Sequence, residues 1–219
     1  MLRYAAAGIV SMVMAGAVFA ASLDGDATYD MLFRGGTLDE VGRDKELIYS
    51  RNVTNTLKPE AEARDTGDIA LSFRTGDIDI ALIEFRRDGK HRSLGTFPAS
   101  VGNPMIMVFY ETVVRDMAEA AGGSPDYIRN RVKEALIQPT DMTAGETIVD
   151  GRMVATQTIR MNPFAGDPNI DRMKGFGDLE LRVTMSEDVP GWYTHLLAEA
   201  SGGEVYKSEL TFLRLDSSP

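Results

Sequence analysis

The chain has 219 residues and a formal net charge of −10, with 33 acidic side chains against 23 Lys and Arg. This excess of negative charge argues against nucleic acid as a partner, because binding to phosphates requires a clustered positive surface, and it gives no attraction to an anionic membrane surface. The sequence contains no cysteine, which excludes disulfides and thiolate catalysis, so a hydrophobic core must stabilise the fold.

The first twenty residues have the composition of an export signal. A single arginine supplies the positive charge, residues 5–17 are uncharged and mostly apolar, and residues 18–20 (Val-Phe-Ala) suit a signal-peptidase site. We expect cleavage after Ala20 or after Ala21, which leaves one periplasmic domain of residues 21–219. The apolar segment is shorter than the roughly 20 residues of a spanning helix, so the sequence favours a removed signal over a retained anchor.

The N-terminal part of this domain is rich in predicted strands. Apolar and polar side chains alternate over residues 69–74, as in a half-buried strand. Asp88-Gly89 has the composition of a tight hairpin turn. We expect strands at 47–57, 69–74, 78–87 and 90–97, a charged linker at 58–65, and no clear element at 28–41.

The middle of the chain predicts two helices, which together cover residues 104–137. Asn103-Pro104 and Ser124-Pro125 each combine a capping side chain with proline at the first helical position. Gly122-Gly123 separates the helices. Each helix has one apolar stripe, so the pair is expected to pack together or side by side on a sheet.

The C-terminal part of the chain returns to strands. Residues 147–161 predict a hairpin around Asp150-Gly151, and residues 162–177 predict a long loop that is either functional or mobile. Strands are then expected in direct succession at 179–185, 192–200 and 205–215, a meander that needs no crossover helix.

These elements predict an α+β domain with a curved, mainly antiparallel sheet of roughly eight or nine strands and an inserted helix pair. The sheet either wraps the helices as a half-barrel or carries them on one flat face. The element order and the expected compartment resemble the periplasmic lipoprotein-carrier (LolA-like) fold. Residues 123–131 (Gly-Ser-Pro-Asp-Tyr-Ile-Arg-Asn-Arg) and 186–193 (Ser-Glu-Asp-Val-Pro-Gly-Trp-Tyr) also resemble an uncharacterised family of exported Gram-negative bacterial proteins. That resemblance implies no activity.

The two histidines are the main candidates for hydrolytic chemistry, since serine-hydrolase motifs are absent. His91 follows a hairpin turn, where a solvated side chain is expected. On a regular strand, His195 shares a face with Tyr193 and Glu199. His195 is then either a hydrogen-bonded, partly buried side chain or a base oriented by Glu199. We assign no catalytic residue, and we expect no metal site and no cofactor, because the histidines are far apart in the sequence and phosphate-binding glycine loops are absent.

Basic side chains on the predicted helices are one candidate for binding a ligand or a partner. Arg129 and Lys133 share a helix face, Arg131 lies nearly opposite, and Arg115 is on the first helix. They either receive an anionic head group or an acidic partner surface, or they are solvated and paired with neighbouring carboxylates.

Three further residues form a second candidate. Trp192, Tyr193 and His195 follow a Pro-Gly turn, and the two aromatic side chains either line the mouth of a pocket or close the end of the core.

The sequence thus predicts an exported, non-enzymatic periplasmic protein that binds or carries a hydrophobic or lipid-like ligand in a groove between sheet and helices. The alternatives are a scaffold of an envelope complex that acts through the helical pair, and a hydrolase with a site around His195. A groove above ~300 Å³, as in typical ligand sites, would favour the carrier, and a filled core would favour the scaffold.

Overall fold

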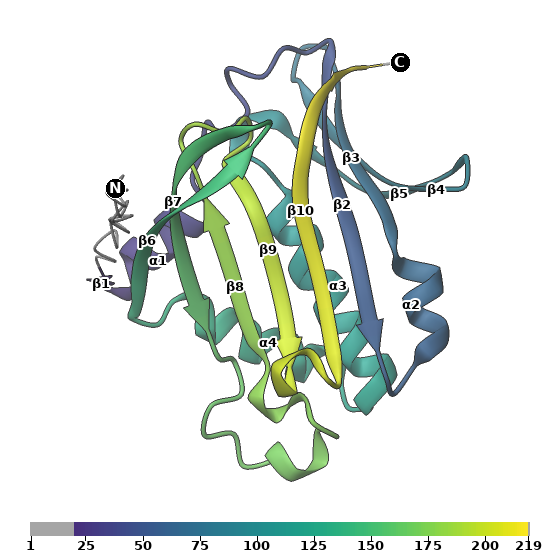
Figure 1. Ribbon diagram of the computed structural model, residues 1–219, viewed down its shortest axis with the longest axis vertical. Helices are drawn as coiled ribbons and strands as arrows, with labels where there is room; N and C mark the ends of the chain where they lie inside the picture. The colour runs from purple at the N-terminus through teal and green to yellow at the C-terminus, as the bar shows by residue number, and fades with distance from the viewer. Residues whose placement is uncertain (1–19, 219) are drawn as a thin grey trace, which may run out of the picture.

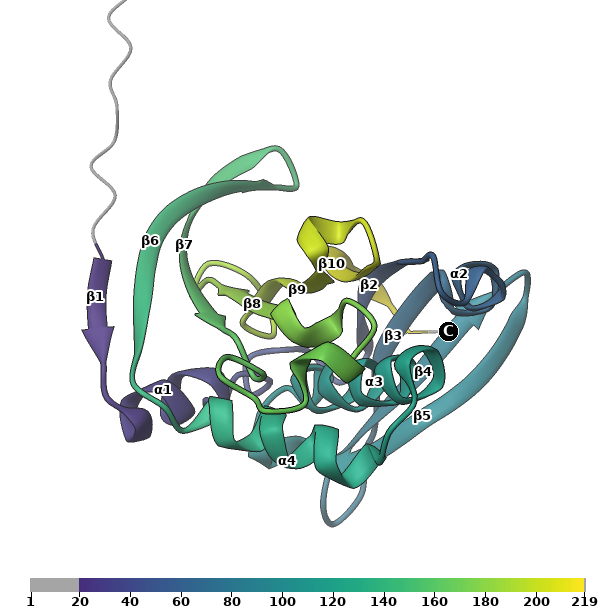
Figure 2. The same cartoon turned by 90° about the horizontal axis from the view of Figure 1, so that it is seen from below.

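The computed structural model describes residues 20–218, so the predicted export signal lies outside the described residues apart from its last residue, Ala20. Ten strands form one sheet in which all neighbouring strands are antiparallel. The strand order is β1-β6-β7-β8-β9-β10-β2-β3-β4-β5. Seen from below, the sheet curves around the helices and does not close (Figure 2). The predicted α+β fold, with a curved antiparallel sheet and an inserted helix pair, is confirmed.

The face of the sheet that carries α3 and α4 is called the inner face below, and the opposite face is called the outer face (Figures 1 and 2). Short 3-10 turns punctuate the loops between the main elements. In chain order the helices and strands are β1 (Ala20–Leu23), α1 (Gly25–Leu32), β2 (Lys45–Asn55), α2 (Pro59–Asp65), β3 (Gly67–Arg74), β4 (Ile80–Arg87), β5 (Lys90–Pro98), α3 (Met105–Ala121), α4 (Pro125–Leu136), β6 (Thr140–Val149), β7 (Arg152–Met161), β8 (Glu180–Met185), β9 (Tyr193–Ala200) and β10 (Tyr206–Ser217).

Both predicted Asp-Gly hairpins are present. Asp88 and Gly89 have φ angles of 49° and 69° between β4 and β5, and Asp150 and Gly151 have φ angles of 50° and 71° between β6 and β7. Positive φ at both central residues is the requirement of the tight turn whose twist matches that of the strands. The local sequence therefore determines both turns.

The predicted helical pair is also confirmed. The side-chain oxygen of Asn103 accepts a hydrogen bond at 3.0 Å from the backbone N–H of Met105, the first residue of α3, while Pro104 is at the N-cap position. Gly122, with φ of 83°, ends this helix. Pro125 occupies the first turn of α4, where the missing N–H costs nothing.

Three elements near the N-terminus differ from the prediction. Residues 58–65 are not a linker, because helix α2 begins at Pro59 and ends at Asp65. The segment without a clear pattern begins inside helix α1, which is capped by a hydrogen bond from the N–H of Ala27 to the carboxylate of Asp24 at 2.8 Å. The tenth strand is β1, which pairs with β6 along the edge of the sheet.

Large side chains fill the space between the inner face and α3. Phe109 and Val113 of α3, Tyr49 of β2, Ile69 of β3 and Leu181 of β8 have no solvent-accessible surface. Complete burial of side chains this large is typical of a close-packed core. The space around these side chains, where the sequence predicted a ligand groove, is therefore occupied by core residues.

Candidate functional site

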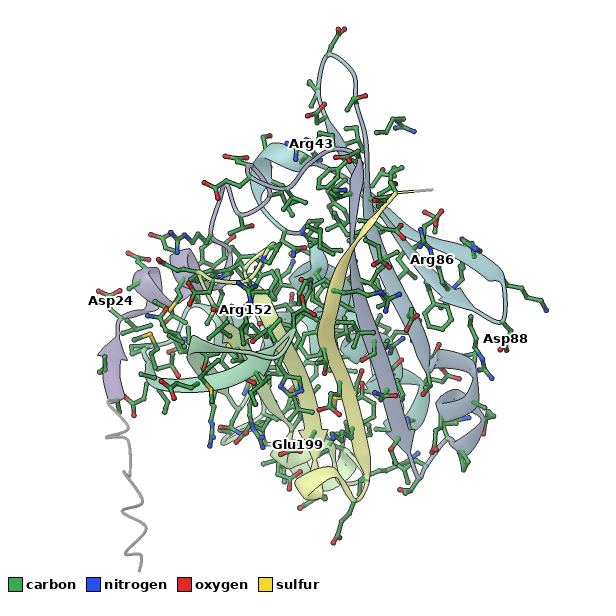
Figure 3. The ribbon with its side chains drawn as sticks, turned by 45° about the horizontal axis from the view of Figure 1, so that its top comes forward. Asp24, Arg43, Arg86, Asp88, Arg152 and Glu199 are labelled. Atoms are coloured by element: carbon green, nitrogen blue, oxygen red, sulfur yellow. The ribbon has the colours of Figure 1, made fainter. Side chains whose placement is uncertain are left out.

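The β6–β7 hairpin turns back over the outer face of the sheet. β7 pairs with β8 only through residues 157–161, and beyond them β6 and β7 pair only with each other. The free part of the hairpin crosses in front of β8 and β9 on the side away from the helices (Figures 1 and 2). Arg152, next to the turn, lies in front of the upper end of these strands (Figure 3).

Burial along β7 confirms this arrangement. Val154 and Thr156 are on the outer face, because side chains alternate along a strand and the core residue Ile159 is on the inner face. They are nevertheless only 4% and 6% exposed, since the hairpin folds over the sheet beneath. On the other side of the hairpin, Ile148 and Met153 are 66% and 64% exposed.

A trough of about 520 Å³ lies between the curled hairpin and the outer face of the sheet. Its walls and floor combine methyl and hydroxyl groups, because threonine is the commonest residue along it. The hydroxyls of Thr158 and Thr184 are 3.0 Å apart and bridge β7 and β8 across its floor. The lining threonines are Thr143, Thr147, Thr156, Thr158, Thr184, Thr194 and Thr211, together with Val149, Arg160, His195 and Glu209 among other residues.

His195 lies in this trough, paired with a carboxylate on the neighbouring strand. Its Nε2 is 2.7 Å from Oε1 of Glu209, whose other oxygen is 2.7 Å from Nζ of Lys207. Burial, the largest influence, acts to raise the pKa of Glu209, but the hydrogen bonds from Lys207 and His195 together hold that pKa below its ordinary value.

Of the two interpretations of His195, a hydrogen-bonded and partly buried side chain agrees with the structure, whereas the pairing with Glu199 is wrong. Glu199 instead forms an ion pair with Arg182 of β8, which also binds Glu180. The partner of His195 is Glu209 on β10, the strand that pairs with β9 on its other side.

Trp192 and Tyr193 are separated from His195 by a β-bulge. Tyr193 pairs with Met185 and His195 pairs with Thr184, so Thr194 is an extra residue on β9. Tyr193 therefore points to the inner face, where its buried hydroxyl donates to the carbonyl of Leu32 at 2.5 Å. The expectation that Tyr193 and His195 share a strand face is thus wrong.

Trp192 closes one end of the core and borders a separate surface hollow. Its indole N–H donates to the carbonyl of Met31 at 3.1 Å, and its side chain is buried. The guanidinium of Arg34 lies 4.6 Å from the centre of its ring and binds Glu187 at 2.9 Å. This hollow, of about 580 Å³, lies between the loop around Arg34 and the turn before β9.

The four basic residues predicted on the helices do not converge on one site. Arg115 belongs to a partly buried network, in which it binds Asp116 at 2.6 Å and lies 3.3 Å from Asp65. The other three lie on α4. Arg129 binds Glu111 and Asp126, both at 2.8 Å, Arg131 binds Glu134 and Asp167, both at 2.8 Å, and Lys133 is exposed.

The remaining features of the described chain suggest no metal centre. His91 is exposed and lies 3.4 Å from Glu84 at the edge of the sheet. Within residues 20–218, no three His, Cys, Asp or Glu side chains are grouped as a metal ion would need. None of the helices in this part of the chain combines the length and the apolar character that crossing a membrane would take.

The trough is not predicted from the sequence, although the sequence contains a pattern that places the residues of its floor on one face of the sheet. Thr156, Thr158 and Arg160 occupy every second position of one predicted strand, as do Arg182 and Thr184 along another. This period of two assigns them to one face of the sheet. No local pattern, however, predicts that the hairpin covers that face.

Comparison with known proteins leaves the family open. No protein-family model matches the chain, and no curated protein matches it. Among solved structures, the crystal structure of the lipoprotein LppX from Mycobacterium tuberculosis aligns with 89% of this chain and 97% of its own, at 12% identity and a TM-score of 0.37. We base no conclusion on a likeness this distant.

Proposed function

We propose that the protein is a non-enzymatic binding protein of the periplasm, with residues 21–219 as its single domain. Its ligand is an amphiphile, a lipid-like molecule with a polar head, and it occupies the trough between the β6–β7 hairpin and the outer face of β8 to β10.

The dimensions and lining of the trough carry this proposal. Its volume of about 520 Å³ is within the range of roughly 300–1,000 Å³ typical of small-molecule sites. The threonine methyl groups and Val149 offer apolar contact, while the threonine hydroxyls, His195 and Arg160 offer hydrogen bonds. A lining of both kinds suits a ligand that is apolar in one part and polar in another.

Exposed apolar side chains on the β6–β7 hairpin also favour the proposal of a lipid-like ligand. Ile148 and Met153 are exposed on its solvent side, whereas most large apolar side chains of this protein are in the core. Adjacent exposed apolar residues are characteristic of surfaces that contact lipids or other apolar partners.

The proposal places the ligand on the opposite face of the sheet from the groove expected from the sequence. The groove side is filled by core residues such as Tyr49 and Phe109. A hydrolytic role is not proposed, because the side chain of His195 has one hydrogen-bond partner in the described part of the chain, Glu209, and that partner is not a nucleophilic hydroxyl.

Mass spectrometry of protein purified under native conditions from its own host tests the proposal. Thr184→Trp would fill the floor of the trough, and Thr211→Phe offers a second blocking variant. Thr54→Trp is the matched control, because Thr54 is exposed on the outer face of β2, away from the trough. We expect a bound amphiphile in the wild type and the control and a loss from both blocking variants.

Two results would contradict the proposal. One is the repeated absence of any amphiphile from wild-type protein, and the other is equal loading of the blocking variants and the control. Thermal unfolding of each variant shows whether the fold survived the substitution.

A second candidate function is a scaffold that acts through the helical pair. The filled core favours it, and so do the exposed apolar side chains of Tyr127 and Ile137 on and after α4. Replacing both residues by aspartate should then remove a partner in pull-down experiments, and an unchanged set of captured proteins would eliminate this candidate.

A further inference from the structure

A further hollow, called the second hollow below and distinct from the one beside Trp192, adjoins the trough at the end of β7. It has a volume of about 470 Å³ and lies between the C-terminal end of α4, the start of β6 and the loop after β7. Polar side chains dominate its lining, namely Arg131, Glu134, Gln138, Thr140, Arg160 and Asn162.

Arg160 connects the two hollows, because it is the one residue that lines both. It lies on the outer face of β7, two residues after Thr158, whose hydroxyl contacts that of Thr184 across the floor of the trough. A ligand with its apolar part in the trough would therefore have its head beside Arg160.

The charge of Arg160 is not compensated by an ion pair within the described residues. Arg182, which faces it from β8, forms ion pairs with two carboxylates, those of Glu180 and Glu199. Arg131, on the other side of the second hollow, is paired with Glu134 and with Asp167. Arg160 itself is exposed, and no carboxylate of the described chain, including that of Asp141 on β6, is within 4.0 Å of its guanidinium.

We infer that the ligand of this protein carries an anionic head, a carboxylate or a phosphate, which is bound by Arg160 at the junction of the trough and the second hollow. A guanidinium binds either group through two parallel charge-assisted hydrogen bonds. The side-chain amides of Gln138 and Asn162 line the same hollow and add uncharged donors. This inference rests on the proposed function and names the class of ligand.

Three probes with the same sixteen-carbon chain test the inference on delipidated, full-length mature protein. Palmitate carries a carboxylate, hexadecyl phosphate carries a phosphate, and hexadecanol is uncharged, and native mass spectrometry measures the affinity for each. We expect Arg160→Ala to weaken binding of the anionic probes by about tenfold or more, because a hydrogen bond to a charged group contributes about 1.5–3 kcal/mol. Hexadecanol should be affected by less than about twofold.

Arg152→Ala is the matched control. Arg152 is an exposed arginine on the same hairpin and lines none of the three hollows described above. This variant should leave the affinity for all three probes unchanged, which separates a specific contact of Arg160 from the general effect of removing one positive charge.

The outcomes separate this inference from the proposed function. A wild-type preference for palmitate or for hexadecyl phosphate identifies the head group, and either preference supports the inference if Arg160→Ala removes it. Equal binding of all three probes, unaffected by Arg160→Ala, would overturn the anionic head and leave the trough as a binding site. Binding of none of the probes, together with unloaded native protein, would overturn both.

Discussion

At the residue scale, the most constrained group of side chains is a buried ionic network that joins the sheet to the helices. Arg51 of β2 and Asp116 of α3 are 2.9 Å apart, and the side chain of each is 1% exposed. The hydroxyl of Tyr206 donates to the same carboxylate at 3.0 Å. A buried charge that loses its partner is strongly destabilising, so each member depends on the others.

Arg51→Met should therefore lower the free energy of unfolding by roughly 3 kcal/mol, since it leaves Asp116 buried with fewer compensating donors. Arg129→Met is the control, because Arg129 pairs with partly exposed carboxylates on the surface and should contribute less than about 1 kcal/mol. Urea denaturation measures both. Equal effects of the two substitutions would contradict the importance of burial here.

The same network predicts a dependence of stability on acid. Burial, the largest influence, acts to raise the pKa of Asp65, but the hydrogen bond from Arg64 and the positive charges of Arg115 and Arg51 hold that pKa below its ordinary value of 3.8. A carboxylate with a lowered pKa in the folded state stabilises the fold above its unfolded pKa, and this stabilisation is lost as the pH falls through the folded pKa.

The free energy of unfolding should thus decline as the pH falls below about 4, and Asp65→Asn should make this decline shallower. Asp126→Asn should not change it, because the side chain of Asp126 is 87% exposed. Thermal unfolding between neutral and acidic pH measures the effect. A slope that is the same in wild type and Asp65→Asn would assign the acid sensitivity to other groups.

At the element scale, two helix starts that look alike in the sequence have different roles. Asn103 and Ser124 each precede a proline at the start of a helix. The side chain of Asn103 accepts a hydrogen bond from the N–H of Met105, the first residue of α3, and donates to the carbonyl of Gly191, at 2.7 Å, and to the hydroxyl of Tyr49, at 3.2 Å. The side chain of Ser124 makes no capping hydrogen bond. Asn103 thus connects α3 to β2 and to the turn before β9.

Asn103→Ala should lower the free energy of unfolding by roughly 2–4 kcal/mol, because the N–H at the start of α3, the carbonyl of Gly191 and the hydroxyl of Tyr49 each lose a hydrogen-bond partner. Ser124→Ala should change it by less than about 0.5 kcal/mol. Chemical denaturation of both variants makes the comparison. Similar losses would contradict the importance of the buried hydrogen bonds of Asn103.

The elements that the sequence predicts correctly are those with a local cause. Asp150-Gly151 forms its turn because both residues accept positive φ, and Gly122 ends α3 for the same reason. Helix α2 also has a local signal, since Pro59 precedes a Glu-Ala-Glu-Ala segment, but the charged composition of residues 58–65 is equally typical of a linker. The pairing of His195 with Glu209 had no local signal, because it depends on a bulge in β9 and on the neighbouring strand.

At the scale of the whole molecule, the strands differ in whether a neighbouring strand is hydrogen-bonded to each of their two edges. β2 and β10 lie inside the sheet and carry buried side chains, whereas the outer part of the β6–β7 hairpin, residues 146–155, has hydrogen bonds only within itself. Local opening should therefore require the least free energy at the hairpin.

Hydrogen–deuterium exchange should follow this order, with the backbone N–H groups of β2, β9 and β10 the slowest and residues 146–155 among the fastest. A ligand in the trough should slow exchange of the hairpin more than that of β2. Uniform protection across the sheet would show instead that the hairpin is held in place as firmly as the core.

The candidate site itself is a property of the whole molecule. Its floor follows from alternation along β7 and β8, which the sequence contains, but its roof is formed by a hairpin that folds across strands far away in the sequence. The burial of Val154 depends on this long-range arrangement, since the side chain is only 4% exposed although it is on the outer face of β7.

The place of β10 in the sheet sets the order in which the chain can fold. This last strand is inserted between β9 and β2, and Tyr206 pairs with Asn55 across 150 positions of the sequence. Without β10, the strands β2 to β5 and the strands β6 to β9 have no backbone pairing with each other in the described sheet. Such distant pairing slows folding, so the two halves of the sheet join only in the step in which β10 takes its place between them.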